Sequence, residues 1–344
     1  MTMTGSKRFN AATLILLALL ASIVLPGCSP RVAELGGQTM GTTWSVKVVD
    51  SPASLADLQR ELEAALVEVN ARMSTYDPDS ELMQFNNAAV GEPFPVSETI
   101  LAVVRISDGV SISTAGAFDV TVGPLVNLWG FGPRKRPERV PSQVEIENAL
   151  GRIGYSHLQI VGKMLVRHAP LFVDLSAVAK GYAVDVLADV LRDNGVERFL
   201  VEIGGELRGQ GLAEAGRPWR VAIEAPIVHA REVYRVVELR GMGLATSGDY
   251  RNYFEVDGQR FSHMIDPRTG RPIKHNVASV SVLHSSVAHA DAWATALNVL
   301  GVDAGMAVAE REGLLALFIL RDDGAFVTRA SPAFDAYVRN IQTR

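Results

Sequence analysis

The feature that most constrains the fold is a run of short strands between residues 198 and 265 with no helix among them. Strands that follow one another this closely pair as neighbours, whereas parallel strands need a long crossover connection, usually a helix. The run therefore predicts a largely antiparallel or mixed sheet in this half of the chain. Apolar alternation and turn residues place its strands near 198–203, 206–212, 218–224, 233–239, 244–246, 252–257 and 260–265.

Helical periodicity flanks this run on both sides. Further strands are expected at 41–50, around 157–173, and at 277–283, 314–320 and 325–328, and residues 116–140 are expected to form a long loop rich in glycine and proline. Ser142 and Glu145 have the spacing of a capping box. The pattern predicts an α+β fold with helices packed on a largely antiparallel or mixed sheet. Apolar residues at helical spacing predict helices over 54–74, 97–114, 142–153, 176–194, 286–301 and 303–312.

The N-terminus has the pattern of an export signal. Lys7 and Arg8 precede a short apolar run, which ends in the sequence LPGC. Cys28 is the only cysteine of the chain, so no intramolecular disulfide can form. We expect residues 1–27 to be a signal peptide, 28–37 a short polar tether and 38–344 the functional domain. An uncleaved signal anchor is the alternative.

Composition excludes a few classes of protein. The chain has 344 residues, a formal net charge of −5, 48% hydrophobic and 21% charged residues, which is an ordinary globular composition. Nothing in it suggests a surface for nucleic acid. The glycines of EIGGELRGQG, 202–211, lie between two strands, so they do not fit the dinucleotide-binding or P-loop fingerprints, which join a strand to a helix.

The helix predicted over 286–301 carries a polar pair on an alanine-rich surface. Asp291 and Thr295 are four residues apart, so both side chains lie on one face of a helix. Together they offer two hard oxygen ligands, which suit Mg²⁺ with substrate phosphates. A threonine bonded back to its own helix, with the aspartate paired to a base elsewhere, is the structural alternative. With one cysteine in the chain, thiolate metal sites are excluded.

Four other stretches have more polar or aromatic residues than a connector needs. Lys180 lies one turn into the helix that begins near Ser176, on a small-residue face where it can meet a phosphate or remain solvated. His263 lies near the end of a predicted strand and can act as a general base or acid or remain structural. Residues 75–86 form a turn-rich segment, either a connector or part of a site. Aromatic residues in 116–132 suit a flat ligand, a domain interface or a small hydrophobic cluster.

Taken together, these stretches resemble the ApbE family of FAD:protein FMN transferases. The resemblance extends from about residue 36 to the C-terminus, and the lipobox-like LPGC also matches many bacterial members. The matching stretches, in order, are TMGTTW (39–44), MSTYDPDSELMQFN (73–86), FDVTVGPLVNLWGFG (118–132), DLSAVAKGYAVD (174–185), EIGGELRGQG (202–211), LATSGDYRNYF (244–254), SHMIDPRTGRP (262–272) and AHADAWATALNVLG (288–301).

The resemblance implies a T-fold-like architecture of two subdomains with the site between them, and a phosphoryl-transfer reaction. FAD would be split at its pyrophosphate, and its FMN half attached to a threonine hydroxyl of a target protein, with AMP leaving. It implies Mg²⁺, with Mn²⁺ as a substitute, held by Asp291, Thr295 and the carbonyl of Ala177, and either His263 or Asp291 as the base. The implied contacts of FAD are Lys180, His263, Met40, Thr75, Tyr76, Asp77, Asp119, Glu202, Gly204, Gly205 and Glu206.

The resemblance also implies a location and partners. Cys28 would carry lipid after cleavage and anchor the protein to a bacterial membrane, facing the periplasm. The expected acceptors are subunits of Na⁺-translocating NADH:quinone reductase or Rnf-type complexes. Two other functions fit the same residues. One is an FAD pyrophosphatase outside the cytoplasm that releases FMN and AMP, and the other is a lipid-anchored FAD-binding protein without turnover.

Overall fold

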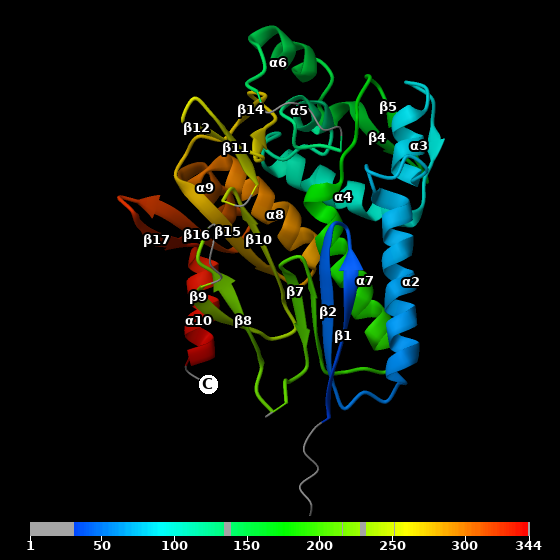
Figure 1. The fold of residues 1–344 in the computed structure, drawn as a ribbon, viewed down its shortest axis with the longest axis vertical. Helices are drawn as coiled ribbons and strands as arrows, with labels where there is room; N and C mark the ends of the chain where they lie inside the picture. The colour runs from blue at the N-terminus through cyan, green and yellow to red at the C-terminus, as the bar shows by residue number, and fades with distance from the viewer. Residues whose placement is uncertain (1–30, 134–138, 215, 228–231, 251, 343–344) are drawn as a thin grey trace, which may run out of the picture.

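The computed structural model describes residues 31–133, 139–214, 216–227, 232–250 and 252–342 (Figure 1). The expected signal peptide and Cys28 lie outside these residues and stay predictions. Residues 32–37, expected to belong to a tether, instead form most of strand β1, Val32–Thr39, because this segment pairs along its whole length with β2, Thr42–Val49. Among the described helices, none has the length and apolar character that a membrane span requires.

The predicted antiparallel pairing is confirmed. An eight-stranded sheet has the order β1-β2-β6-β7-β10-β15-β16-β17, and each neighbouring pair is antiparallel. The remaining strands form four small sheets. Beyond β1 and β2, the large sheet contains β6 Phe199–Ile203, β7 Glu206–Gln210, β10 Gly243–Gly248, β15 Val277–His284, β16 Leu315–Asp322 and β17 Ala325–Ala330. The small sheets contain β3 Phe94–Pro95, β4 Leu158–Val161, β5 Met164–Arg167, β8 Trp219–Glu224, β9 Val233–Leu239, β11 Tyr253–Val256, β12 Gln259–Ser262, β13 Ile265–Asp266 and β14 Arg271–Pro272.

The predicted helices also form, close to their expected ends. The capping box of Ser142 and Glu145 is present in both directions. The predicted helices are α2 Leu55–Met73, α4 Glu98–Ser113, α6 Gln143–Leu150, α7 Ser176–Asp193, α8 Val287–Leu300 and α9 Val302–Arg311.

Three short helices were not predicted. Helix α3, Glu81–Asn87, lies in the stretch interpreted as turn-rich, where the Ser80 side chain caps it by accepting from the amide of Met83. Helix α5, Gly123–Leu128, interrupts the expected loop. Helix α10, Pro332–Gln342, closes the chain, and its Phe334 is fully buried. Helices α3 and α5 are too short for helical periodicity to give a strong signal, whereas α10 does have apolar residues at helical spacing.

Two faces of the large sheet are covered by different elements. The largest hydrophobic cluster lies between one face of the sheet and helices α2, α4, α7 and α8 (Figure 1). The other face of the sheet is covered by the β8–β9 hairpin and α10. A separate cluster joins α5 and α6 to the β11–β12 hairpin and β13, at the top of the view in Figure 1. The molecule therefore has a large layered body and a smaller unit at one end, as the predicted α+β fold of two subdomains requires.

Candidate functional site

The site is built where helices α7 and α8 cross. Gly181 of α7 lies against α8 so closely that a β-carbon there would be 2.8 Å from the β-carbon of Asp291 and would collide with the Val287 carbonyl. The small residues of the two helices therefore serve close packing first. This approach brings Asp291 of α8 to the first turns of α7, where its Oδ2 accepts a hydrogen bond of 3.0 Å from the Gly181 amide.

Three charged groups meet beside this crossing. The Nζ of Lys180 lies 2.8 Å from Oε1 of Glu206 and 3.9 Å from Oδ1 of Asp291. Glu206 is 2% exposed and Asp291 is 5% exposed, whereas the side chain of Lys180 keeps 32% of its surface accessible. Two buried carboxylates therefore share a single ammonium group.

This arrangement shifts the proton affinity of all three groups. Burial, with the nearby charge of Asp291, raises the pKa of Glu206 to about 7 although Lys180 opposes the shift. Burial also raises the pKa of Asp291, against the opposing effect of Lys180. Burial disfavours the Lys180 ammonium, yet the combined charges of Asp291 and Glu206 outweigh it and raise the pKa of Lys180. Lys180 thus stays charged, and an additional cation beside the carboxylates would be favourable.

These groups line a cavity of about 400 Å³ between the large body and the smaller unit. Of the predicted residues, the cavity brings together Tyr76, Ala177, Lys180, Glu206, His263, Asp291 and Thr295. It also contains polar residues that the sequence analysis did not assign to the site, namely Asp174, Ser176, Thr246, Ser247 and Asn252. All five lie in two stretches that carry the family resemblance, 174–185 and 244–254, and this was the signal available for them.

The oxygen atoms in this cavity fit a hard divalent cation. Asp291 and Thr295 line the same wall as Ala177 of α7. In a regular helix the amide of residue 181 bonds to the carbonyl of residue 177. The carboxylate of Asp291 competes for that amide, which leaves the Ala177 carbonyl with capacity for another partner. The carboxylate of Asp291 and the hydroxyl of Thr295 are hard oxygen donors, which suit Mg²⁺ that also binds substrate oxygens. Among the described residues, no group of three or more histidine, cysteine or acidic side chains could hold a metal ion by itself.

His263 faces the cavity from the segment after β12. Its Nδ1 lies 3.0 Å from the carbonyl oxygen of Asn252 and must be the donor, because a carbonyl only accepts. In the neutral ring Nε2 is then the basic nitrogen. Burial lowers the pKa of His263, so the neutral form prevails near neutral pH. Its ring also meets Phe131 edge-on, with centroids 6.2 Å apart.

The remaining predicted residues lie outside the walls of this cavity. Asp119 lines a smaller cavity of about 60 Å³ that shares Ala177 and Thr295 with the large one. Its carboxylate is buried and accepts hydrogen bonds from the Thr121 amide and hydroxyl and from the Tyr155 amide. Burial raises the pKa of Asp119 against these bonds. The observed role of Asp119 is to hold the loop that leads into α5.

The other predicted contacts lie in two hairpin turns and in the segment between α2 and α3. Met40 has a φ of +48° in the tight turn between β1 and β2. Glu202 Oε1 accepts from the Gly205 amide, and Gly204 and Gly205 have φ of +58° and +106° in the turn that starts β7. Thr75 is buried with no partner for its hydroxyl among the described residues, and Asp77 is exposed and accepts from the Asp79 amide.

The aromatic residues of 116–132 mostly form a hydrophobic cluster. Trp129 is buried against Phe254 and Phe261, and its Nε1 donates to the Gly270 carbonyl over 2.8 Å. Phe131 alone of the aromatic residues in this stretch lines the large cavity. For Trp129, the structure supports the alternative of a small hydrophobic cluster. Of the aromatic residues in this loop, only Phe131 offers a flat surface to a ligand in the large cavity.

The chain is similar in sequence to proteins of one known family. The sequence profile of the ApbE family matches residues 40–318. The FAD:protein FMN transferase of Vibrio cholerae is 48% identical over 328 residues, covering 94% of this chain and 98% of that protein. The enzyme of the same name from Escherichia coli K12 is 42% identical over 337 residues, covering 93% and 96%.

Solved structures resemble the fold over the same extent. The flavin transferase ApbE from Vibrio cholerae superposes with a TM-score of 0.84 at 48% identity, covering 89% of this chain and 99% of that one. The apo form of the Pseudomonas stutzeri flavinyl transferase ApbE gives a TM-score of 0.83 at 45% identity, with coverage of 90% and 97%.

Proposed function

The chain belongs to the ApbE family of FAD:protein FMN transferases, and from that membership we propose that it transfers FMN from FAD to a threonine of an acceptor protein with Mg²⁺ bound. One observation carries the finer assignment. One cavity of about 400 Å³ is lined by residues from α7, α8 and the segment after β12, namely Ala177, Lys180, His263, Asp291 and Thr295.

The reaction is a substitution at phosphorus. The threonine Oγ forms a bond to the phosphorus of the FMN half, and the bond from that phosphorus to the bridging oxygen breaks, so that AMP departs with the electron pair. The proton of the hydroxyl passes to a base. Such transfers need positioning and charge neutralisation more than covalent help. Lys180 supplies a fixed positive charge on the cavity wall for the pyrophosphate.

Asp291, Thr295 and the carbonyl of Ala177 would hold the metal. When bound, Mg²⁺ would neutralise charge that develops on the phosphate oxygens. The chain itself supports this role through the close contact of α7 and α8 at Gly181, which sets the distance between Ala177 and the two ligands of α8.

We assign the base to His263 rather than to Asp291. The Nδ1 of His263 is engaged with the Asn252 carbonyl, and its lowered pKa keeps Nε2 free of a proton near neutral pH. Asp291, by contrast, has one oxygen bonded to the Gly181 amide and the other facing Lys180. Its carboxylate is therefore better suited to hold a cation.

The location and the partners rest on the sequence. We propose that the protein is exported and anchored by lipid at Cys28, in the periplasm of a bacterial cell. Acceptors would then be exported or membrane-bound domains, of which subunits of Na⁺-translocating NADH:quinone reductase and Rnf-type complexes are the proposed examples.

Mass spectrometry of an acceptor tests the function. The purified protein is incubated with FAD, Mg²⁺ and a threonine-containing acceptor domain, and AMP release is followed in parallel with and without the acceptor. We expect FMN on the acceptor threonine, AMP in equal amount, and loss of both with EDTA. AMP release at the same rate with and without the acceptor would favour the pyrophosphatase. Tight binding of FAD without AMP release would favour a flavin-binding protein.

A further inference from the structure

We infer that Glu206 is a positioning residue which holds the ammonium of Lys180 away from Asp291 and so keeps the Asp291 carboxylate open to a metal cation. This inference rests on the proposed metal site. It assigns to Glu206 a task different from contact with FAD, which the family resemblance implies for it.

The distances show an unequal sharing of one ammonium group. The Nζ of Lys180 is 2.8 Å from Glu206 but 3.9 Å from Asp291. The first distance is that of a charge-assisted hydrogen bond, and the second is only an ion-pair separation. A lysine side chain is long enough to reach either carboxylate, and without Glu206 the nearest anion to its ammonium is Asp291. Paired with Asp291, the ammonium would occupy the position that the metal cation needs.

Glu206 is held rigidly enough to resist this movement. It is the first residue of β7, directly opposite Ile203 in the hairpin with β6, and it is 2% exposed. The hairpin turn is closed by a bond of 2.7 Å from the Gly205 amide to Glu202 Oε1. A β-carbon on Gly204 would lie 3.4 Å from the Cδ of Lys180, so the lysine stem runs along this turn.

The unpaired oxygen of Glu206 points to the same role. Its Oε2 is buried and has no hydrogen-bond partner among the residues that the structure describes. The side chain of Glu206 contacts the Lys180 ammonium, 2.8 Å from Oε1, and its own backbone amide. A carboxylate buried for structural reasons is normally satisfied on both oxygens. Oε1 of Glu206 instead makes a strong contact with Lys180, and this contact determines the position of the ammonium group.

The competition can be measured without FAD and without turnover. Mn²⁺ serves as the probe, and its affinity is measured by calorimetry at pH 8 for the wild type, Glu206→Gln, Lys180→Met and the double variant. We expect Glu206→Gln to weaken Mn²⁺ binding at least tenfold, because the ammonium moves onto Asp291. In the Lys180→Met background, where no ammonium competes, the same substitution should weaken binding less than about threefold, which is a coupling between the two sites.

The cycle separates competition from simple charge. If Glu206 acts only through its own negative charge, the glutamine substitution weakens binding by the same factor in both backgrounds, and the inference is overturned. An unchanged affinity in Glu206→Gln also overturns it. Asp189→Asn removes an equal charge from an exposed position of α7, paired with Arg192, and should leave the affinity unchanged.

Structure and folding provide a second measurement. A crystal structure of Glu206→Gln should show the Lys180 ammonium within hydrogen-bond distance of Asp291, and an ammonium that stays in place contradicts the inference. If the glutamine variant does not fold, Glu206→Asp, which is shorter by one methylene, takes its place with the same expected direction. A wild type that binds no Mn²⁺ would overturn the proposed metal site along with this inference, whereas binding with equal factors overturns the inference alone.

Discussion

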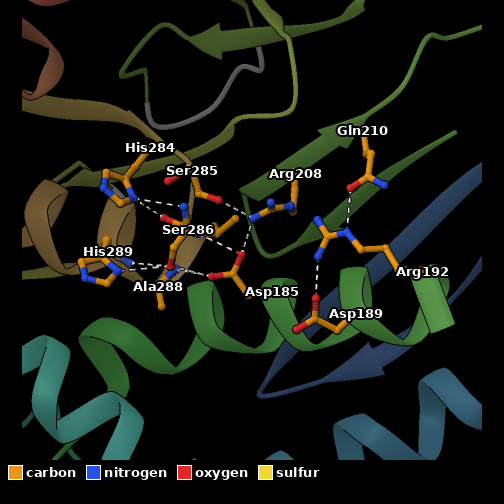
Figure 2. Close-up of polar contacts among 11 residues, drawn as sticks. Asp185, Asp189, Arg192, Arg208, Gln210, His284, Ser285, Ser286, Ala288 and His289 are labelled. Atoms are coloured by element: carbon orange, nitrogen blue, oxygen red, sulfur yellow. Dashed lines mark hydrogen bonds and ion pairs between the residues drawn. The ribbon is translucent and has the colours of Figure 1, made fainter. Parts of the chain in front are cut away.

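Two polar clusters lie along the contact of α7 with α8, and they are built in opposite ways. Asp185 of α7 meets the N-terminus of α8 and Arg208 of β7 (Figure 2). One turn earlier along α7, Lys180 and Gly181 meet Asp291 and Glu206. The first cluster pairs the partly exposed Asp185 with Arg208, and the second pairs two buried acids with Lys180. We call the first cluster saturated because both of its carboxylate oxygens are bonded, whereas Oε2 of Glu206 in the second is not.

Both carboxylate oxygens of Asp185 are satisfied, although the buried Nε of Arg208 has no hydrogen-bond partner among the described residues. Oδ1 accepts from Arg208 over 2.7 Å and from the Val287 amide over 3.0 Å, and Oδ2 accepts from the Ser286 hydroxyl over 2.8 Å and the Ala288 amide over 3.1 Å (Figure 2). A carboxylate at a helix N-terminus also gains from the helix dipole. This cluster therefore locks the two helices together, while the Lys180 cluster retains an unpaired oxygen and the capacity to bind a ligand.

Removing an acid from the unsaturated cluster should affect the reaction far more than the fold. For Asp291→Asn we expect the rate of FMN transfer to fall about a thousandfold, because several kcal/mol of charge stabilisation by the metal is lost. The stability should change by less than about 1 kcal/mol, since the amide oxygen still accepts from Gly181 and a buried charge is removed. Transfer assays and urea unfolding measure the two quantities. A stability loss in Asp291→Asn well above about 1 kcal/mol would contradict the predicted difference between the two clusters.

Removing the acid of the saturated cluster should reverse this order. Asp185→Ala leaves Arg208, whose side chain is 13% exposed, without its carboxylate and uncovers two amides of α8. We expect the free energy of unfolding to fall by about 3 kcal/mol. Asp185→Asn, which keeps one acceptor, should lose less. Urea unfolding measures both variants, and a loss below about 1 kcal/mol for the alanine variant would contradict a locking role.

The sequence reveals the two clusters unequally. The spacing of Asp291 and Thr295 predicts one face of a helix, and the structure places both residues at the cavity as expected. Glu206 could be assigned only by family resemblance, because its contact with Lys180 joins a strand to a helix through the β6–β7 turn. Asp185 ends the stretch DLSAVAKGYAVD but gave no local signal, since its partners Ser286 and Arg208 are distant in sequence.

The fold shows the same division between local and distant information. Antiparallel strands and long amphipathic helices have periodic patterns, and these were predicted. The structural task of Asp119 depends on the Tyr155 amide, 36 residues away, so its sequence neighbours could not reveal it. Helix α10 is the exception, because Phe334, Tyr337, Val338 and Ile341 have helical spacing and the helix could have been predicted locally.

The pH dependence of stability should differ between the two kinds of acid. Glu206 has its pKa raised to about 7 by burial and by Asp291, above the ordinary 4.5. The stability that its protonated form contributes is present below pH 4.5 and is lost as the pH rises through 7. In EDTA, the wild type should therefore lose up to about 3 kcal/mol relative to Glu206→Gln between pH 5 and 8.

An exposed acid with the opposite shift provides the control for this measurement. The hydrogen bond from Arg139 lowers the pKa of Glu145 to about 2, so its contribution is present above 4.5 and is lost only as the pH falls through 2. The difference between the wild type and Glu145→Gln should stay constant from pH 5 to 8. If the stability of the wild type relative to Glu206→Gln changes with pH no more than its stability relative to Glu145→Gln, then burial does not destabilise the Glu206 carboxylate.

The smallest expected effect tests whether the saturated cluster has a redundant member. Ser286→Ala removes the hydroxyl that donates to Asp185 and caps the His289 amide, while Asp185 still accepts from the Val287 and Ala288 amides. We expect a loss of about 1 kcal/mol with unchanged Mn²⁺ affinity. Ser285→Ala is the matched control, because Arg208 uses only the backbone carbonyl of Ser285 and its stability should not change measurably. A Ser286→Ala variant with weakened Mn²⁺ binding would show that the locked end of α8 transmits strain to Asp291, and the two clusters would then have to be treated as one unit.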